Sequence, residues 1–247
     1  MRWVSLLLLL ALTSAVVAAP SWREEALAAE ARLDSARALE LFLQMHRAQP
    51  DDAFILQKIA QQYSDLVVDQ PDLESKKRYA RMALEWAERA VQADPTSAIN
   101  VLSLAVCHGK LATLSDTRSK VRYSRLVREE AERALQLDPN YAWAHHVLGR
   151  WHREVAELGS TARFFVRMFY GGLPDASVTE AVTHLERAVA LEADNLNHVL
   201  ELGFASAAAG QPDRARTVWT RGLAMPVRGK HDEAAKQRAR DALARLN

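Results

Sequence analysis

Three histidines, His145, His146 and His152, are the residues whose type and grouping first suggest chemistry. A metal ion needs ligands that converge on one point, and neighbouring helical residues point about 100° apart. Only His145 and His152, two helical turns apart, therefore share a face. No carboxylate or thiol follows at ligand spacing, and the stretch 152–154 (His-Arg-Glu) lacks the two-histidine pattern of a zinc protease. The pattern favours surface or packing histidines, and we expect no metal and no other cofactor.

Other catalytic signatures are also missing from the sequence. There is no glycine-rich phosphate loop, no Gly-x-Ser-x-Gly elbow and no carboxylate pair in an identifiable cleft. Cys107 is the single cysteine, so no intramolecular disulfide can form, and its apolar helical surroundings indicate a small buried residue. The sequence predicts a protein without catalytic residues. The alternative is an enzyme with a site at the insertion 160–177.

The element that must position any functional residue is a helical hairpin, clearest between Asp194 and Pro226. Small residues at Gly203 and Gly222 allow close helix approach, and Trp219 fills the space around the contact. A helix-turn-helix unit of about 34 residues is typical of the tetratricopeptide repeat. One such hairpin cannot bury its own apolar face, so others must stack on it.

The same helix ending, followed by proline or alanine, recurs upstream at 89–95, 133–139 and 187–193. Proline blocks helix continuation, and a following polar residue can cap the next helix. These boundaries lie further apart than the period of about 34 residues, so the inner hairpins are elongated. The predicted units are a first hairpin at 19–50, repeats at 51–95, 96–139, 140–193 and 194–226, and a capping helix at 227–247.

Small residues align at three positions in each repeat. The aligned sets are Ala60/Ala83/Ala90, Ala105/Val127/Ala134, Gly149/Ala181/Ala188 and Gly203/Ala215/Gly222. Only Val127 departs from the rule, so its repeat should pack less tightly or with a shifted crossing. The predicted fold is all-α, a tetratricopeptide-like right-handed solenoid of about five hairpins with a capping helix.

The amino terminus predicts export. Residues 1–18 combine Arg2, an apolar run and small residues at Val16 and Ala18, the pattern of a secretory signal peptide cut after Ala18. A retained membrane anchor is the alternative. The preference for arginine over lysine and the abundance of alanine suggest a GC-rich genome, so we expect a periplasmic or secreted bacterial protein.

The charge balance argues against one class of partner. The chain has 32 basic and 31 acidic residues. Nucleic-acid binding usually requires a strong basic excess, so the sequence predicts a protein or peptide partner and no nucleic acid.

The concave face of a stacked-repeat superhelix, lined by the first helix of each hairpin, is the usual ligand surface. Counting along each first helix places a polar, partly basic set there. Its members are Gln57, Gln61, Lys110, His146, Arg150, Arg153 and Asn197. An acidic peptide or chain terminus could bind through charge-assisted hydrogen bonds. A solvated groove without a single ligand stays an equal alternative.

The insertion at 160–177 is basic and aromatic. Its candidate contact residues are Arg163, Phe165, Arg167 and Phe169. It can pack on the preceding hairpin, lie on a membrane as a basic amphipathic helix, or contact a partner. Because aromatic residues cover nearly all its sides, packing is favoured and membrane contact is not.

These stretches also resemble a known family. The run 151–174, the hairpin sequence that follows at 176–182 and 187–188, and the upstream run 85–91 are similar to regulator of microtubule dynamics proteins. The resemblance implies a helical repeat domain that acts through protein contacts, with no catalytic residues to transfer. Eukaryotic members are associated with microtubules or with membrane-anchored contacts between organelles, partners that an exported bacterial protein would not meet. The predicted function is a protein-interaction scaffold of the envelope, with a membrane-associated assembly factor as the alternative.

Overall fold

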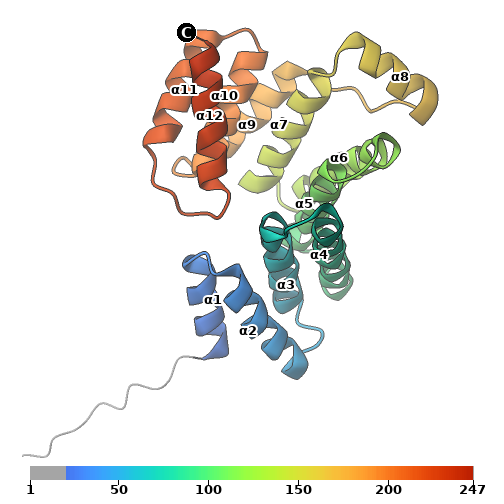
Figure 1. Cartoon of the computed structure of the whole chain (residues 1–247), viewed down its shortest axis with the longest axis vertical. Helices are drawn as coiled ribbons and strands as arrows, with labels where there is room; N and C mark the ends of the chain where they lie inside the picture. Colours follow the sequence, from blue (N-terminus) through green and yellow to red (C-terminus); the bar gives the residue numbers. More distant parts are fainter. Residues whose placement is uncertain (1–20, 247) are drawn as a thin grey trace, which may run out of the picture.

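The computed structural model describes residues 21–246, and within this range it contains helices and no strands (Figure 1). Five antiparallel hairpins follow one another along the chain. They pair α1 (Trp22–Ala31) with α2 (Ser35–Ala48), α3 (Ala53–Leu66) with α4 (Leu73–Ala93), α5 (Ala98–Thr113) with α6 (Thr117–Leu137), α7 (Ala142–Ala156) with α9 (Val178–Leu191), and α10 (Leu196–Ala208) with α11 (Pro212–Ala224). A short 3₁₀ helix, η1 (Val67–Asp69), follows α3, α8 (Ser160–Tyr170) is inserted between α7 and α9, and α12 (Asp232–Arg245) ends the chain. The predicted all-α solenoid with a capping helix is confirmed, and the expected leader 1–18 lies outside the described residues.

The helices begin where a polar residue can cap them. Asp52 accepts a hydrogen bond from the Ile55 backbone N–H, and Ser97 and Asp116 do the same for α5 and α6. Such a cap satisfies one of the backbone donors that a helix leaves open at its amino end. The hairpin boundaries are therefore local properties of the sequence.

The hairpins form two layers. The first helices α3, α5, α7 and α10 contact one another in succession, whereas α4, α6, α9 and α11 make no such contacts with each other among residues 21–246. The first helices thus line the inner side of the superhelix and the second helices its outer side. Figure 1 shows the resulting curve, with α3, α5 and α7 along its inner side.

Close helix crossings depend on the small residues predicted above. A Cβ added at Gly203 would lie 2.3 Å from Trp219 Cδ1, and one at Gly149 would lie 2.6 Å from Leu185 Cγ. Val127, the exception to the rule, is nevertheless buried. A Cβ built on Gly109 of α5 would lie 3.8 Å from Val127 Cγ2, an ordinary van der Waals contact. Val127 is therefore accommodated in this crossing without a close approach at Gly109.

The last loop reaches back to the second hairpin. Lys230 Nζ lies 2.5 Å from Asp69 Oδ2, and His231 Nε2 lies 3.1 Å from Asp65 Oδ1. These pairs join residues more than 160 positions apart, from the segment before α12 to the end of α3 and η1. The chain thereby bridges the carboxyl-terminal end of the curve and its second hairpin.

Candidate interaction surfaces

One stripe of α5 forms the centre of the inner surface. Ile99, Ser103, Val106 and Lys110 are spaced by three or four residues and so share a helical face. Gln57 Nε2 of α3 donates to Ser103 Oγ at 3.4 Å, which places this face beside α3. Ile99 and Val106 are 52% and 43% exposed, although aliphatic. Along the stripe, two apolar side chains therefore alternate with a hydroxyl and an ammonium group.

Lys110 is the charged member of the stripe. Within the described residues its side chain makes no hydrogen bond or ion pair, while burial lowers its pKa and the Asp65 carboxylate acts in the opposite direction. The positive charge of Arg150 on α7 also lowers the pKa of Lys110. An ammonium group that is partly desolvated and lacks a partner is suited to bind an anionic group.

The two predicted arginines on α7 differ in their surroundings. Arg150 Nε donates to Glu154 Oε1 at 2.7 Å, one turn away on the same helix. Arg153 instead binds Glu201 of α10 at 2.8 Å, and that glutamate is 2% exposed. Arg153 therefore compensates a buried carboxylate, whereas Arg150 lies in a half-exposed surface pair.

The remaining predicted residues also have partners within the fold. Gln61 Nε2 donates to Glu30 Oε1 at 2.7 Å, and Glu30 also binds Lys58. Asn197 Nδ2 donates at 2.7 Å to Asp232, the first residue of α12. The structure thus places Gln57 beside the α5 stripe that contains Lys110, keeps Arg150 in a pair on α7, and uses Gln61 and Asn197 to connect neighbouring elements.

The histidines pack in pairs across helices. His145 Nδ1 lies 2.9 Å from His184 Nδ1, and His146 Nδ1 lies 3.1 Å from His198 Nδ1. His152 stacks on His184 with 5.8 Å between ring centroids. Burial lowers the pKa of each of these five histidines. They are neutral packing groups, and His146, predicted on the concave face, is buried against α10.

Among residues 21–246 there is no group of three or more histidine, cysteine, aspartate or glutamate side chains placed to hold a metal ion. Cys107 is 2% exposed, and burial raises the pKa of its thiol to about 12. A hollow of about 440 Å³ near the start of α9 and the end of α10 is lined by Val178, Thr179, Val182, Thr183, Ala208, Ala209 and Gln211. None of these residues titrates, so this hollow supplies no acid or base.

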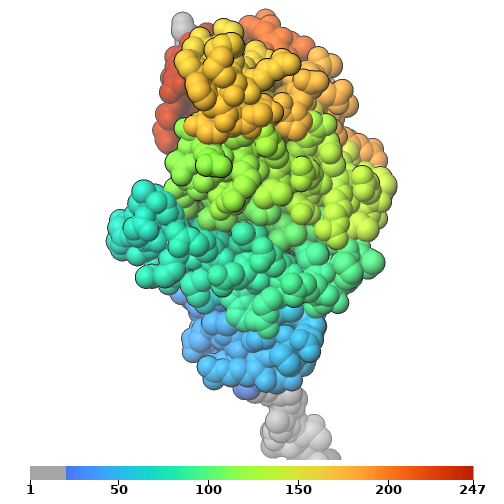
Figure 2. All heavy atoms as spheres, turned by 90° about the vertical axis from the view of Figure 1, so that its right-hand side faces the viewer, coloured from blue at the N-terminus to red at the C-terminus, as the bar shows by residue number. Residues whose placement is uncertain are grey.

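Helix α8 is the largest difference from the sequence expectation. The sequence favoured packing of this segment, but no residue of α8 is buried. Phe164, Phe165, Met168 and Phe169 are between 50% and 63% exposed. Figure 2 shows α8, in yellow, projecting over the green α6 on this face. The error came from counting aromatic residues without their directions, because the packed side of α8 carries only Val166 and Tyr170.

The end of α8 is held by α6. The guanidinium of Arg125 donates to the carbonyl oxygens of Tyr170 and Gly172, the latter at 3.1 Å from Nε. Arg128 Nη1 donates to the Asp175 carbonyl at 3.4 Å. Gly171 and Gly172 have φ of 75° and 82°, a backbone conformation that suits glycine at a helix end. The second half of the insertion is therefore attached through its backbone and through Leu173 and Ala176, which pack against Trp151, while the aromatic side chains of α8 stay exposed.

Sequence reasoning missed Ile99, Val106 and Asp65 on the inner surface. The spacing of Ile99 and Val106 from Lys110 was a usable signal, since all three fall on one helical face. Asp65 could not be found in this way, because its partner His231 comes from the other end of the chain.

Comparison with solved structures finds a TPR protein with the same fold. TTC0263, a thermophilic TPR protein of Thermus thermophilus, matches at a TM-score of 0.65 and 19% identity over 89% of this chain and 96% of its own. The human IFIT1 dimer with PPP-AAAA matches at a TM-score of 0.50 and 18% identity over 86% of this chain and 50% of its own. YrrB, a TPR protein described as having an unusual peptide-binding site, matches at a TM-score of 0.45 and 13% identity over 89% and 90% of the two chains.

A search of curated protein sequences found no match. A family model described as Regulator of microtubule dynamics protein 1-3 matches residues 24–247, which take in the described helices from the first turn of α1 through α12, with the basic-aromatic insertion among them. The chain therefore belongs to the regulator of microtubule dynamics family and is a tetratricopeptide-type repeat protein.

Proposed function

We propose that this protein is a non-catalytic interaction scaffold that binds an extended peptide segment of a partner protein along the α5 stripe. The single observation that carries the proposal is the alternation on one inner helix of Ile99, Ser103, Val106 and Lys110. Two exposed aliphatic side chains can hold apolar residues of a peptide, and the polar pair can bind its backbone or charge.

The charge of the stripe favours a carboxylate in the bound segment. Lys110 belongs to the stripe, Arg150 lies on the next inner helix, and Lys110 has no acidic partner within salt-bridge distance in the described chain. A peptide carboxylate, from an acidic side chain or a free chain terminus, would restore the interaction that the desolvated ammonium lacks. The Asp65 carboxylate acts on the pKa of Lys110 in the opposite direction to burial, so it compensates part of the ammonium charge.

We further propose that the protein acts in the bacterial envelope after export by residues 1–18, as either a free adaptor or an assembly factor. The signal-like amino terminus motivates this location. Loss of a multiprotein envelope complex after deletion of the gene would favour the assembly factor. An intact complex would favour the free adaptor.

The binding surface can be tested by site-specific photocrosslinking. A photoreactive phenylalanine is placed at Val106 on the α5 stripe, and a matched one at Leu137, which is 40% exposed at the end of the outer helix α6. We expect position 106 to crosslink to a defined set of partner proteins, and we expect none of these proteins to crosslink to position 137. Crosslinking must be lost in Lys110→Glu if the groove recognises a carboxylate.

The crosslinked peptide, identified by mass spectrometry, is then synthesised with its carboxylate intact and with the matching amide. A loss of affinity of about tenfold on amidation corresponds to one charge-assisted hydrogen bond. Equal crosslinking from positions 106 and 137, or equal affinity of the two peptides, would contradict the proposed site or its charge preference respectively.

A further inference from the structure

The exposed side of α8 is apolar over a continuous arc. At 3.6 residues per turn, Phe164, Phe165, Met168 and Phe169 lie within about 140° of one another around the helix. The two half-buried residues, Val166 and Tyr170, lie on the opposite side, toward α6. The aromatic rings also contact each other, with Phe165 stacked on Phe169 at 5.9 Å between centroids. The helix therefore presents one ordered apolar face to its surroundings.

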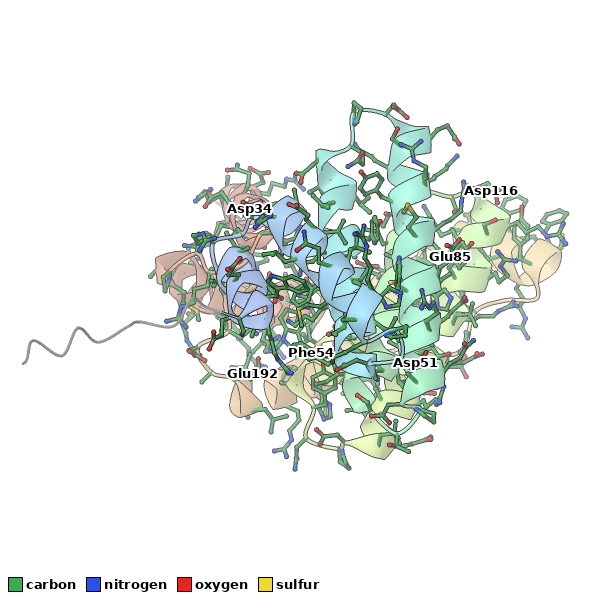
Figure 3. All side chains as sticks on the ribbon, turned by 90° about the horizontal axis from the view of Figure 1, so that it is seen from below. Asp34, Asp51, Phe54, Glu85, Asp116 and Glu192 are labelled. Carbon is green, nitrogen blue, oxygen red and sulfur yellow. The ribbon has the colours of Figure 1, made fainter. Side chains whose placement is uncertain are left out.

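Basic residues lie beside the apolar face of α8, and the helix carries no acidic residue. Arg163 and Arg167 occupy one edge of α8, and no acidic residue occurs between positions 158 and 174. The neighbouring half of α6, residues 117–128, has five basic residues and no acidic one. Arg125 and Arg128 bind the backbone of residues 170–175, and the other three, Arg118, Lys120 and Arg122, are exposed. Figure 3 labels Asp116, the N-cap that precedes this half of α6, on the same side of the molecule as α8.

The shape and charge of this surface match a lipid bilayer better than a protein groove. A helix that lies in a bilayer interface places its apolar face among the acyl chains and its cations beside the headgroups. Anionic headgroups provide negative charge over a wide area, which suits cations spread over two helices. A protein groove would need acidic residues placed opposite each of them. No helix in the described chain is long and apolar enough to cross a membrane.

We propose that α8, together with the amino-terminal half of α6, docks on the surface of an anionic membrane with Phe164, Phe165, Met168 and Phe169 inserted. The Arg125 hydrogen bonds to the carbonyls of Tyr170 and Gly172 fix α8 to the solenoid. Membrane docking would thus set the orientation of the whole superhelix. This inference uses a surface separate from the α5 stripe and stands independently of the proposed peptide binding.

The experiment uses the full chain with Met168→Cys labelled by an environment-sensitive fluorophore. Cys107 is 2% exposed, so labelling is confined to the introduced cysteine. The labelled protein is mixed with phosphatidylcholine vesicles and with vesicles containing about one third phosphatidylglycerol. Because the fluorophore reports on position 168 itself, residues 1–20 do not contribute to its signal.

We expect a blue shift and quenching by lipid-bound quenchers with the anionic vesicles, and at least a tenfold weaker response with the neutral ones. A matched protein labelled at Val68→Cys, on η1 and 51% exposed before substitution, should show neither change. If the emission from position 168 remains that of a fluorophore in water when anionic vesicles are added, the proposal is overturned. This is also the result expected if α8 binds a protein and not a membrane.

Two pairs of variants separate the apolar and basic contributions in vesicle co-sedimentation. Phe165→Ser with Phe169→Ser should lower the fraction bound to anionic vesicles about tenfold, and Arg163→Glu with Arg167→Glu should lower it by a similar factor. Val68→Ser with Leu73→Ser removes equally exposed apolar side chains elsewhere and should have no effect. An equal loss in this control pair would also contradict docking through α8.

Discussion

The guanidinium of Arg153 lies 2.8 Å from the carboxylate of Glu201, Nη2 to Oε1, although the two residues stand 48 positions apart on α7 and α10. Glu201 is 2% exposed, and Arg238 of α12 lies 3.9 Å from its other oxygen. The guanidinium groups of Arg153 and Arg238 also both lie over the ring of Phe204. One buried carboxylate therefore connects the third repeat, the last repeat and the capping helix.

Arg153→Ala should lower the free energy of unfolding by about 3 kcal/mol, because it leaves Glu201 buried with only the more distant Arg238. Arg150→Ala is the matched control on the same helix. It removes a surface pair with Glu154 and should change stability by less than about 1 kcal/mol. Urea unfolding of both variants measures the difference, and equal effects would show that the Glu201 contact is not formed in solution.

Gly203→Ala should destabilise the protein by about 1–3 kcal/mol, because the new Cβ would lie 2.3 Å from Trp219 Cδ1 and force the helices apart. Gly109→Ala is the opposite case within α5, since its Cβ meets only Val127 at 3.8 Å. There the gain in helix propensity should stabilise the protein by about 0.5–1 kcal/mol. Thermal melting of the two variants gives the signs, and a destabilised Gly109→Ala would show that the Val127 crossing is tighter than described.

Stability should decrease as the pH falls from about 6.5 toward 4, through the buried histidines. Burial lowers the pKa of His108 to about 4, so between these values the unfolded chain binds a proton that the folded protein excludes. Stability therefore rises with pH in this window and is lost on acidification. For His108 alone the loss between pH 7 and pH 5 is about 2 kcal/mol.

His108→Phe tests this contribution, because a phenyl ring can keep the stacking on Tyr123, where the ring centroids are 5.7 Å apart. It also removes an Nδ1 atom that has no partner in the described chain. The variant should lose about 2 kcal/mol less than the wild type between pH 7 and pH 5 in denaturant titrations. Parallel pH profiles for the two proteins would rule out His108 as a source of the acid sensitivity.

The closure of the superhelix predicts a specific chemical crosslink. A zero-length carbodiimide joins an amine to a carboxylate only when the two are in contact, and Lys230 Nζ lies 2.5 Å from Asp69 Oδ2. We expect a peptide linked through these two residues in mass spectra of the treated protein. Lys58 and Glu30, 2.7 Å apart within the amino-terminal region, provide the positive control. A crosslink in the control pair without one at Lys230 would mean that the superhelix is open in solution.

The sequence by itself was enough to predict the repeat architecture, because each determinant acts over a short distance. Asp52 and Asp116 start their helices by capping a donor a few residues ahead. Gly203 and Ala188 lie where two helices cross, either within one hairpin or between adjacent hairpins, and only small side chains fit there. In a solenoid each unit packs mainly on the next, so local rules repeated along the chain specify the fold.

Only the tertiary structure decided what the polar residues do. Arg150 and Arg153 have the same residue type on adjacent turns, yet one lies in a surface pair and the other compensates a buried carboxylate on α10. The Lys230 and Asp69 contact depends on how much the stacked hairpins curve in total, which is a sum of small rotations at every interface. The exposure of Phe165 likewise depends on whether another element covers α8. No local pattern encodes these long-range distances, which is why the sequence predicted the solenoid but not the partners of its charges.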